Sequence, residues 1–374
     1  MIHRYLYMLL FCCLPGFRAG SQDTAALKWW NPAGAGCTEG QAWPAESIRP
    51  YDRLPQRAAG QVPEEVWSLS QQAAGLVVRF RTDAQQITVR YQVTGALAMP
   101  HMPATGVSGI DLYGYNDRRF LWCAGKYSFR DTIQYRFTGL QPQTAPAAGI
   151  EYRLFLPLYN GVKWLEVGVP GGSRFAAMPA RKETPVVVYG TSIVQGACAS
   201  RPGMAWTALL SRRLNRPVAN LGFSGTGRLD EPVVKLIAGI SAAVFVLDCL
   251  PNLIGGKAVF TDKEIHDRLV AAVKQLRHSH PSVPVIITDH FGYTDAAINP
   301  EKRAAYRHVN RINHQVFAAL LARGVRRLYL LPAEQLHQDE DTMVDGIHPT
   351  DLGMMRYAEA YEKLIRRVLK ETNR

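Results

Sequence analysis

From residue 185 to its end, the chain alternates short, wholly apolar segments with longer segments of helical periodicity. The apolar segments are too short for core helices and are typical of strands buried on both faces. Such strands, alternating with helices, predict a doubly wound parallel sheet with helices on both sides. The expected strands are residues 185–189, 217–221, 242–248, 283–289 and 326–331. The expected helices are residues 204–214, 231–240, 261–278, 300–323 and 350–372, the third capped by Thr261.

The preceding part of the chain follows a period of two. Short runs of alternating apolar and polar residues are separated by turn residues, a pattern that predicts antiparallel strands. The expected strands are residues 75–82, 86–93, 109–113, 134–137, 151–158 and 162–169. Strands at this spacing favour an all-β sandwich of the jelly-roll kind. We therefore expect a sandwich domain at 28–175 and an α/β domain at 184–374, joined by a basic linker.

The first 20 residues have the composition of a secretory signal peptide. His3 and Arg4 precede an apolar run at 5–17, and small residues follow from Ala19. The run is too short to span a bilayer, so we expect no stable membrane insertion. The sequence thus predicts a secreted or periplasmic protein.

Four cysteines follow the predicted signal peptide: Cys37, Cys123, Cys198 and Cys249. An oxidising compartment permits disulfides, and four cysteines allow three connectivities. Cys37 with Cys123 is the pair we favour, because both fall in the N-terminal half. Cys249 ends an apolar run and is expected to be a buried thiol.

The net charge of +12 requires that nucleic acid be considered as a partner. The basic residues are scattered over helix-like segments and form no stripe interleaved with aromatic residues. We therefore expect no nucleic-acid partner, and a solvated basic surface that attracts anionic glycans or the cell envelope.

Polar residues gather where the predicted parallel strands end, at 190–193, 223–227, 248–252 and 289–290, and again at 345–348 before the last helix. In open parallel sheets, reactive groups collect outside the carboxyl ends of the strands. These segments are therefore expected to meet at one edge of the sheet.

Together the segments supply the parts that acyl transfer requires. Ser192 is the candidate nucleophile and His348 its base, since a free serine needs an adjacent base. Asp345 can hold the far nitrogen of the imidazole. The backbone N–H of Ser192, the N–H of Gly225 and the side-chain amide of Asn252 are candidate donors for an oxyanion hole.

Each of these residues also has a structural reading. Ser192 alone suits a helix cap, and Asp345 suits a turn before a helix that starts with Pro349. Gly225 and Asn252 alone suit turns and caps. The five residues together favour catalysis, because caps and turns would account for the other residues but not for His348.

Other reactive side chains are expected to be structural. Cys198 lacks a flanking feature that would lower its thiol pKa, and His290 is at least as well explained by a hydrogen-bonded structural role. His278, His280, His337 and Asp339 lack metal-ligand spacing and suit a solvated surface.

These segments resemble the four blocks of the SGNH (GDSL-like) hydrolases. The blocks read Gly-Thr-Ser-Ile at 190–193, Asn-Leu-Gly-Phe-Ser-Gly at 220–225, a segment ending at Asn252, and Asp-Gly-Ile-His-Pro at 345–349. The resemblance implies a flavodoxin-like three-layer α/β/α fold, no metal or cofactor, and ester hydrolysis through an acyl-serine. Two segments depart from the pattern: Thr191 replaces the usual acid, and the usual Gly-x-Asn-Asp reads Leu-Pro-Asn-Leu at 250–253.

The string Gly-Ile-Asp-Leu-Tyr at 109–113 resembles the G-x-D-L-Y signature of β-domains attached to a bacterial SGNH subgroup. For that subgroup, acetylated glycans are the expected substrates. Asp111 and Tyr113 share one face of their strand, as a packed pair or as contacts to substrate.

We therefore expect a secreted carbohydrate acetylesterase that acts on an acetylated glycan or another small ester. A lipid esterase or lysophospholipase is the alternative within enzymes, although no apolar lid segment is evident. A glycan-binding protein with an inactive hydrolase domain is the alternative outside enzymes, and the retention of all five site residues argues against it.

Overall fold

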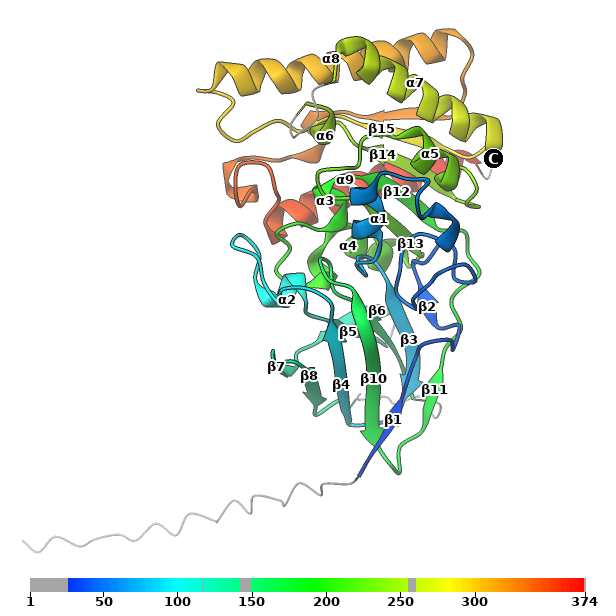
Figure 1. Cartoon of the computed structure of the whole chain (residues 1–374), viewed down its shortest axis with the longest axis vertical. Coiled ribbons are helices and arrows are strands. Elements are labelled where there is room, and N and C mark those ends of the chain that lie inside the picture. Colours follow the sequence, from blue (N-terminus) through cyan, green and yellow to red (C-terminus); the bar gives the residue numbers. More distant parts are fainter. Residues whose placement is uncertain (1–25, 117, 142–148, 255–259, 373–374) are drawn as a thin grey trace, which may run out of the picture.

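The computed structural model describes residues 26–116, 118–141, 149–254 and 260–372. The predicted signal peptide lies outside the described residues. Figure 1 shows two parts stacked along the long axis, one of antiparallel strands and one of parallel strands with helices.

The first part is a β-sandwich of two antiparallel sheets, as predicted. One sheet has the order β1 (Leu27–Trp30), β10 (Val162–Pro170), β4 (Gln86–Val93), β8 (Ile133–Thr138), β7 (Lys126–Ser128). The other has the order β11 (Phe175–Ala177), β3 (Val77–Thr82), β9 (Ile150–Phe155), β5 (Asp111–Asn116), β6 (Arg119–Cys123), with β2 (Thr38–Glu39) also paired to β3. The period of two sets the core: on β8, Ile133, Tyr135 and Phe137 are buried between the sheets.

The second part is a five-stranded parallel sheet. Its order is β13 (Val218–Gly222), β12 (Val186–Gly190), β14 (Val244–Asp248), β15 (Val285–Thr288), β16 (Leu328–Leu331). β12, the first of these five strands along the chain, thus lies second in the sheet, which is the flavodoxin-like order. This order places the ends of β12, β13 and β14 side by side.

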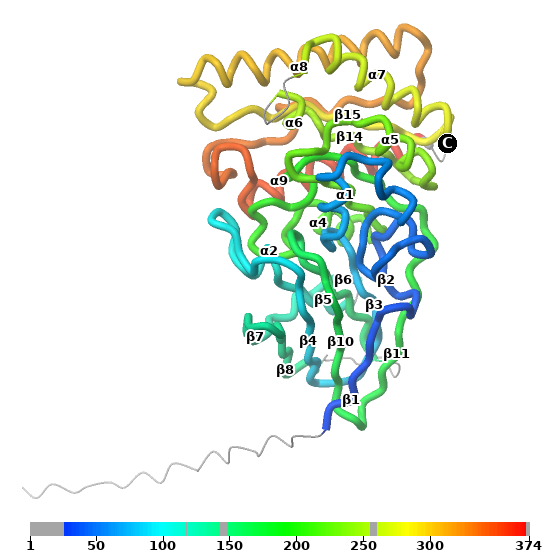
Figure 2. The backbone as a smooth tube through the Cα atoms, in the orientation of Figure 1, coloured from blue at the N-terminus to red at the C-terminus, as the bar shows by residue number. Residues whose placement is uncertain are grey.

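An N-terminal segment lies against this second part rather than in the sandwich. It holds a 3-10 turn at Gln56–Ala58 and the helix α1 (Glu64–Ser70), drawn in blue beside the upper part in Figure 2. Leu54 and Val66 are wholly buried in the same apolar cluster as residues of β12 and β13. Arg53 is also buried and donates to the carbonyl oxygens of Asn220 (3.1 Å) and Gly222 (2.7 Å). The segment therefore covers the edge of the parallel sheet.

Helices cover both faces of the parallel sheet, giving the three layers expected. One face carries α3 (Ser192–Gln195), α4 (Trp206–Leu214) and α9 (Asp351–Thr372). The other carries α5 (Glu231–Ile237), α6 (Pro251–Ile254), α7 (Asp262–Ser279) and α8 (Pro300–Ala322). Further 3-10 turns lie at Pro202–Met204, Ala333–Leu336 and Glu340–Thr342, and a short helix α2 (Ala104–Val107) belongs to the sandwich part.

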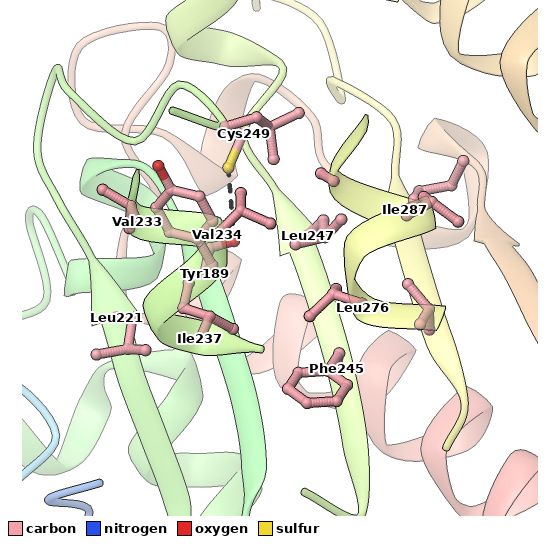
Figure 3. Close-up of a cluster of buried hydrophobic side chains, with 14 of the residues drawn as sticks. Tyr189, Leu221, Val233, Val234, Ile237, Phe245, Leu247, Cys249, Leu276 and Ile287 are labelled. Atoms are coloured by element: carbon pink, nitrogen blue, oxygen red, sulfur yellow. Dashed lines mark hydrogen bonds between the residues drawn. The ribbon is translucent and has the colours of Figure 1, made fainter. Parts of the chain in front are cut away.

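Successive strand residues face opposite layers, so each strand must be apolar throughout. Val186 and Val188 of β12 belong to the cluster under α4 and α9, whereas Val187 and Tyr189 belong to the cluster under α5 and α7. Figure 3 shows the second cluster, where Tyr189 meets side chains from the helices above the sheet.

The predicted cap of α7 is confirmed. Thr261 accepts from the N–H of Glu264, and the Glu264 carboxylate accepts in return from the N–H of Thr261 at 2.7 Å. No helix in the described part of the chain is both long and apolar enough to cross a membrane.

The predicted pairing of Cys37 with Cys123 is wrong, because all four cysteines named above are free thiols. Cys37 lies beside β3, and Cys123 lies on β6, three strands away in the same sheet. Three strand spacings are about 14 Å, whereas a disulfide joins Cα atoms less than about 7 Å apart. Cys249 is a buried thiol, as predicted, and donates to the carbonyl oxygen of Tyr189 (Figure 3).

Candidate active site

The turn after β12 presents Ser192 at the carboxyl edge of the sheet. Thr191 caps α3 by accepting from the N–H of Ile193 at 3.3 Å, and Ser192 is the first residue of the helix. Gly190 is required here, because a Cβ at this position would lie 2.5 Å from the carbonyl oxygen of Asp248 on β14. Thr191, which replaces the usual acid, therefore shapes the turn and leaves the serine hydroxyl free to face the edge.

Ser192, His348 and Asp345 form a continuous hydrogen-bonded chain. Ser192 Oγ lies 2.8 Å from His348 Nε2, and His348 Nδ1 lies 2.7 Å from Asp345 Oδ2. The other oxygen of Asp345 accepts from the backbone N–H of His348 (2.9 Å) and of Ile347 (3.2 Å). The structure thus brings together the three residues predicted to act as nucleophile, base and orienting carboxylate.

The surroundings of Asp345 favour its ionised form. Partial burial alone would raise the pKa of the carboxyl. The hydrogen bonds from the imidazole and from the two backbone N–H groups outweigh burial and hold the pKa below its usual value. An ionised Asp345 requires a proton on His348 Nδ1, which leaves Nε2 free to accept the serine proton.

The loop that carries His348 is fixed on both sides. Within the loop, the N–H of Val344 donates to the carbonyl oxygen of His348 at 2.8 Å. From the neighbouring loop, the N–H of Thr294 donates to the carbonyl oxygen of Gly346 at 3.3 Å. Gly346 has a φ of +88°, a conformation that glycine adopts without strain. The imidazole is therefore held before α9 begins.

The glycine-rich loop after β13 crosses the end of β12. A Cβ on Gly227 would lie 1.9 Å from the carbonyl oxygen of Gly190, so only glycine fits at this crossing. With its amide oriented so that the oxygen faces the backbone donors of this loop, Asn252 accepts from the N–H of Thr226 (3.2 Å) and Gly227 (3.1 Å). This leaves the amide NH₂ of Asn252 available as a donor.

Two backbone N–H groups, those of Gly225 and Ser192, are the candidate oxyanion donors from the backbone. Gly225 has a φ of +71°, and a Cβ there would meet no heavy atom within 4 Å. Within the described residues, no backbone acceptor takes the N–H of Gly225 or of Ser192. These N–H groups and the Asn252 amide are the three donors predicted for an oxyanion hole.

The residues after β15, Asp289 and His290, make hydrogen bonds within the fold, which is the structural role expected for His290. His290 is wholly buried, which lowers its pKa to about 3 and keeps the ring neutral. Its Nδ1 accepts from the N–H of Gly292 at 2.9 Å. The Asp289 carboxylate is bound by Asn313 (2.9 Å) and His314 (2.7 Å) of α8, and so ties β15 to that helix.

Among the described residues, Cys198, Asp345 and His348 form the one group whose potential metal-ligating atoms lie within 4.8 Å of one another. Two of the three already form the hydrogen-bonded pair described above. Burial, and then the Asp345 charge, raise the pKa of the Cys198 thiol to about 12, so the sulfur keeps its proton at neutral pH. The chemistry of this group fits acid–base work better than metal binding.

Sequence reasoning missed a contribution of the sandwich part to this site. His101 is exposed, and its ring centroid lies 6.1 Å from that of His348, with the planes 26° apart. In Figure 1 the cyan loop that carries His101 rises beside the orange segment before α9. Flanking prolines, Pro100 and Pro103, mark a stiff loop, but no sequence signal links it to His348.

The arrangement supports acyl transfer. It provides a serine oxygen, an imidazole that can take its proton, a carboxylate for the resulting cation, and the N–H groups of Ser192 and Gly225, which no backbone acceptor takes among the described residues. These are the groups that a tetrahedral intermediate requires.

Comparison with known families agrees with this chemistry. Residues 183–366 match the GDSL-like Lipase/Acylhydrolase family, and residues 27–175 match the GxDLY family, described as the N-terminus of Esterase_SGNH_hydro-type. No curated protein matches the chain.

Solved structures give the same fold. A Bacteroides ovatus protein described as a GDSL-like lipase is 29% identical, with a TM-score of 0.82, over 92% of this chain and 98% of that one. The salicylyl-acyltransferase SsfX3 of a tetracycline biosynthetic pathway is 19% identical, with a TM-score of 0.70, over 91% and 97%. A family two carbohydrate esterase from Clostridium thermocellum, solved with cellohexaose, is 14% identical, with a TM-score of 0.53, over 79% and 93%. The chain therefore belongs to the SGNH (GDSL-like) esterase family, in the subgroup that carries an N-terminal GxDLY domain.

Proposed function

We propose that the protein is a serine esterase that removes O-acetyl groups from a carbohydrate, with Ser192, His348 and Asp345 as its catalytic residues. The observation that carries the proposal is the unbroken chain from Ser192 Oγ to His348 (2.8 Å) and from His348 to Asp345 (2.7 Å).

Acylation begins when His348 Nε2 takes the proton of Ser192 and Oγ attacks the ester carbonyl carbon. The imidazolium so formed faces the ionised Asp345 carboxylate, which stabilises it. The imidazolium then gives its proton to the departing alcohol oxygen as the C–O bond breaks. The products of this half-reaction are a free carbohydrate hydroxyl and an acetyl ester on Ser192.

Deacylation repeats these steps with water. His348 takes one proton from the water as the water oxygen attacks the acetyl carbon, and that proton then passes to Ser192 Oγ as acetic acid leaves and ionises to acetate. In both halves the N–H groups of Ser192 and Gly225 and the amide of Asn252 donate to the oxyanion. Because these donors are already oriented by the fold, they stabilise charge without reorganising.

The proximity of the sandwich part supports a carbohydrate substrate. His101 places a polar ring from that part beside His348, so the alcohol that departs as the acyl-serine forms meets side chains of both parts. Such a site suits a large polyhydroxyl leaving group. The fold likeness to a carbohydrate esterase solved with cellohexaose agrees with this choice but does not identify the sugar.

One observation favours a second candidate, an esterase for a more apolar substrate. Val344, beside Asp345, is 47% exposed, and Leu352 and Met355 at the start of α9 are 46% and 38% exposed. Ile298, on the loop that contacts Gly346, is 86% exposed. An acyl chain longer than acetyl would bury some of this surface, so preference for chain length separates the two candidates.

We also propose that the protein is exported. The charged, apolar and small-residue order of the first 20 residues supports this, and an external compartment is where a carbohydrate polymer would be met.

The test compares the wild type with Ser192→Ala on 4-nitrophenyl acetate, butyrate and octanoate, followed by acetate release from acetylated xylan and pectin. Ser68→Ala, an exposed serine on α1, serves as the control. We expect acetate to be the preferred acyl group and turnover to disappear only in Ser192→Ala. A preference for octanoate would replace the carbohydrate proposal with the lipid one. Full activity in Ser192→Ala, or glycan binding without hydrolysis by the wild type, would overturn the mechanism.

A further inference from the structure

The loop at 196–204, which joins α3 to α4, leads directly away from the nucleophile. It has an unusual backbone: Gly196 has a φ of +109°, and Cys198, which is not glycine, has a φ of +66°. A non-glycine residue in this region persists only where its surroundings hold it. Cys198 also lies beside the site, with its sulfur within 4.8 Å of ligating atoms of Asp345 and His348.

The same loop is tied to the base. The N–H of Ser200 donates to the Asp351 carboxylate at 2.9 Å, and the Ser200 hydroxyl donates to its other oxygen. Asp351 is the first residue of α9 and follows His348 by three positions. The loop therefore connects the helix that carries the serine to the segment that carries the imidazole.

The sandwich part holds this loop through Asp111, the acidic residue of the G-x-D-L-Y string. Asp111 is only 4% exposed, and its carboxylate accepts from Arg201 (2.8 Å), from the N–H of Gly203 (2.7 Å) and from the indole of Trp122 (3.0 Å). Arg201 donates as well to the hydroxyl of Tyr113 at 2.7 Å, and its guanidinium lies 4.2 Å from the Trp122 ring centroid. One carboxylate thus fixes two positions of the loop.

The helix α2 of the sandwich adds a second contact to the loop. Thr105 donates to the carbonyl oxygen of Ser200 at 2.7 Å. A Cβ on Gly106 would lie 2.3 Å from the carbonyl oxygen of Ala199, so the two backbones touch. Figure 2 shows the cyan chain around α2 lying next to the green chain that follows α3.

We propose that Asp111 is a positioning residue of the active site, whose carboxylate clamps the 196–204 loop and thereby fixes His348 relative to Ser192. The proposal rests on the esterase function above. It assigns Asp111 no contact with substrate, because the carboxylate is buried and its three donors all come from this chain. The proposal also means that the G-x-D-L-Y string contributes to catalysis, by positioning the loop, as well as to packing.

The chain offers a matched control in Glu39 of β2. Glu39 is 5% exposed and accepts from Arg181 at 2.7 Å and 2.8 Å, while Arg181 donates to the carbonyl oxygen of Asn215. Asn215 ends α4, just before β13 begins, and so lies at the sheet edge opposite Ser192. Glu39 therefore makes a similar buried ion pair with a linker arginine that in turn bonds to the second part, without touching the catalytic edge.

The experiment compares the wild type, Asp111→Asn and Glu39→Gln in three measurements: thermal unfolding, kcat and KM for 4-nitrophenyl acetate, and the rate at which thiols react with dithionitrobenzoate. We expect both variants to unfold at lower temperature. Only Asp111→Asn should lose kcat, by roughly ten- to a hundredfold with KM little changed, because a displacement of about 1 Å can slow catalysis on that scale.

The thiol measurement reports on the loop directly. Cys198 is 6% exposed, and it should become one additional fast-reacting thiol in Asp111→Asn but not in Glu39→Gln. The additional thiol should disappear in Asp111→Asn with Cys198→Ser. If Asp111→Asn does not fold, Arg201→Lys, which keeps the charge but loses the forked geometry, takes its place with the same expectations.

Two results would overturn the clamp: kcat within twofold of wild type in the folded variant, or an equal loss of kcat in Glu39→Gln. A failure of the esterase function would give a different result, because the turnover of Ser192→Ala would then equal that of the wild type. The thiol measurement would still decide the clamp in that case, because an unchanged Cys198 rate would show that Asp111 does not hold the loop.

Discussion

Replacing Asp345 by Asn tests the roles proposed for Ser192, His348 and Asp345 with a minimal change of shape. The Asn side-chain oxygen can still accept from the N–H groups of His348 (2.9 Å) and Ile347 (3.2 Å), so the loop should keep its conformation. The amide NH₂ then faces His348 Nδ1, which must accept rather than donate. The ring proton moves to Nε2 and points at Ser192, where a base is needed.

The expected loss of kcat can be worked out from the solvent exposure of the His348–Asp345 pair. Opposite charges about 4 Å apart attract by about 1 kcal/mol in water and about 4 kcal/mol at the edge of a protein. The side chains of His348 and Asp345 are 22% and 38% exposed, which places the pair between these limits. A loss of about 2 to 3 kcal/mol of stabilisation for the imidazolium lowers kcat roughly thirty- to two-hundredfold. The wrong tautomer lowers it further, so the total should approach a thousandfold.

The assay is steady-state hydrolysis of 4-nitrophenyl acetate, with thermal unfolding as the folding control. We expect kcat to fall while KM changes little, because Asp345 acts on the transition state. Asp345→Asn should remain more active than Ser192→Ala, which lacks the nucleophile. A folded Asp345→Asn that keeps more than a third of the wild-type kcat would refute the assigned role of Asp345.

Three further changes probe the oxyanion donors and the core. Asn252→Ala should lower kcat for 4-nitrophenyl acetate about a hundredfold at similar KM, and a loss below fivefold would remove Asn252 from the oxyanion hole. Burial raises the pKa of Asp248 to about 7, so the native state holds a proton that the unfolded state releases. The stability that this proton gives is present below pH 4 and is lost as the pH rises through 7. Urea unfolding at pH 5 and pH 8 should therefore show the wild type losing roughly 2 to 3 kcal/mol more than Asp248→Asn, and equal losses would contradict the raised pKa. Trp206 is wholly buried and stacks on Tyr361 at 4.3 Å, so Trp206→Ala should reduce the urea-derived free energy of unfolding by about 3 to 5 kcal/mol, and a loss under 1 kcal/mol would contradict this packing.

The regular elements of the α/β part could be predicted because its strands are apolar on both faces. The strand expected at 185–189 is β12 (Val186–Gly190), and the helix expected at 300–323 is α8 (Pro300–Ala322). Once the strands are known, the rule for parallel sheets brings their carboxyl ends together. That rule alone leads to Ser192 and Asn252.

The features that were not predicted depend on partners distant in sequence. Arg53 is buried against the carbonyl oxygens of Asn220 and Gly222, and the residues near it in the sequence do not indicate this burial. His101 reaches His348 from the other part of the chain for the same reason. The domain limits at 28–175 and 184–374 stay predictions, and the packing of the segment around Arg53 shows that the sequence order and the spatial grouping differ.

The pairing of cysteines failed for a related reason. Proximity in sequence favoured Cys37 with Cys123, but the order of strands in the sheet separates them. Sheet order is set by which strand pairs with which, and periodicity carries no such information.

The separation of Ser192 and His348 by 156 positions has a consequence for a chain that is still being synthesised. The serine leaves the ribosome long before the imidazole, because His348 lies on the segment directly ahead of α9 (Asp351–Thr372). A chain synthesised only as far as α8 (Pro300–Ala322) therefore has Ser192 but no His348 to pair with it. The contact between Ser192 Oγ and His348 Nε2 therefore forms only after both segments have been synthesised and have folded together.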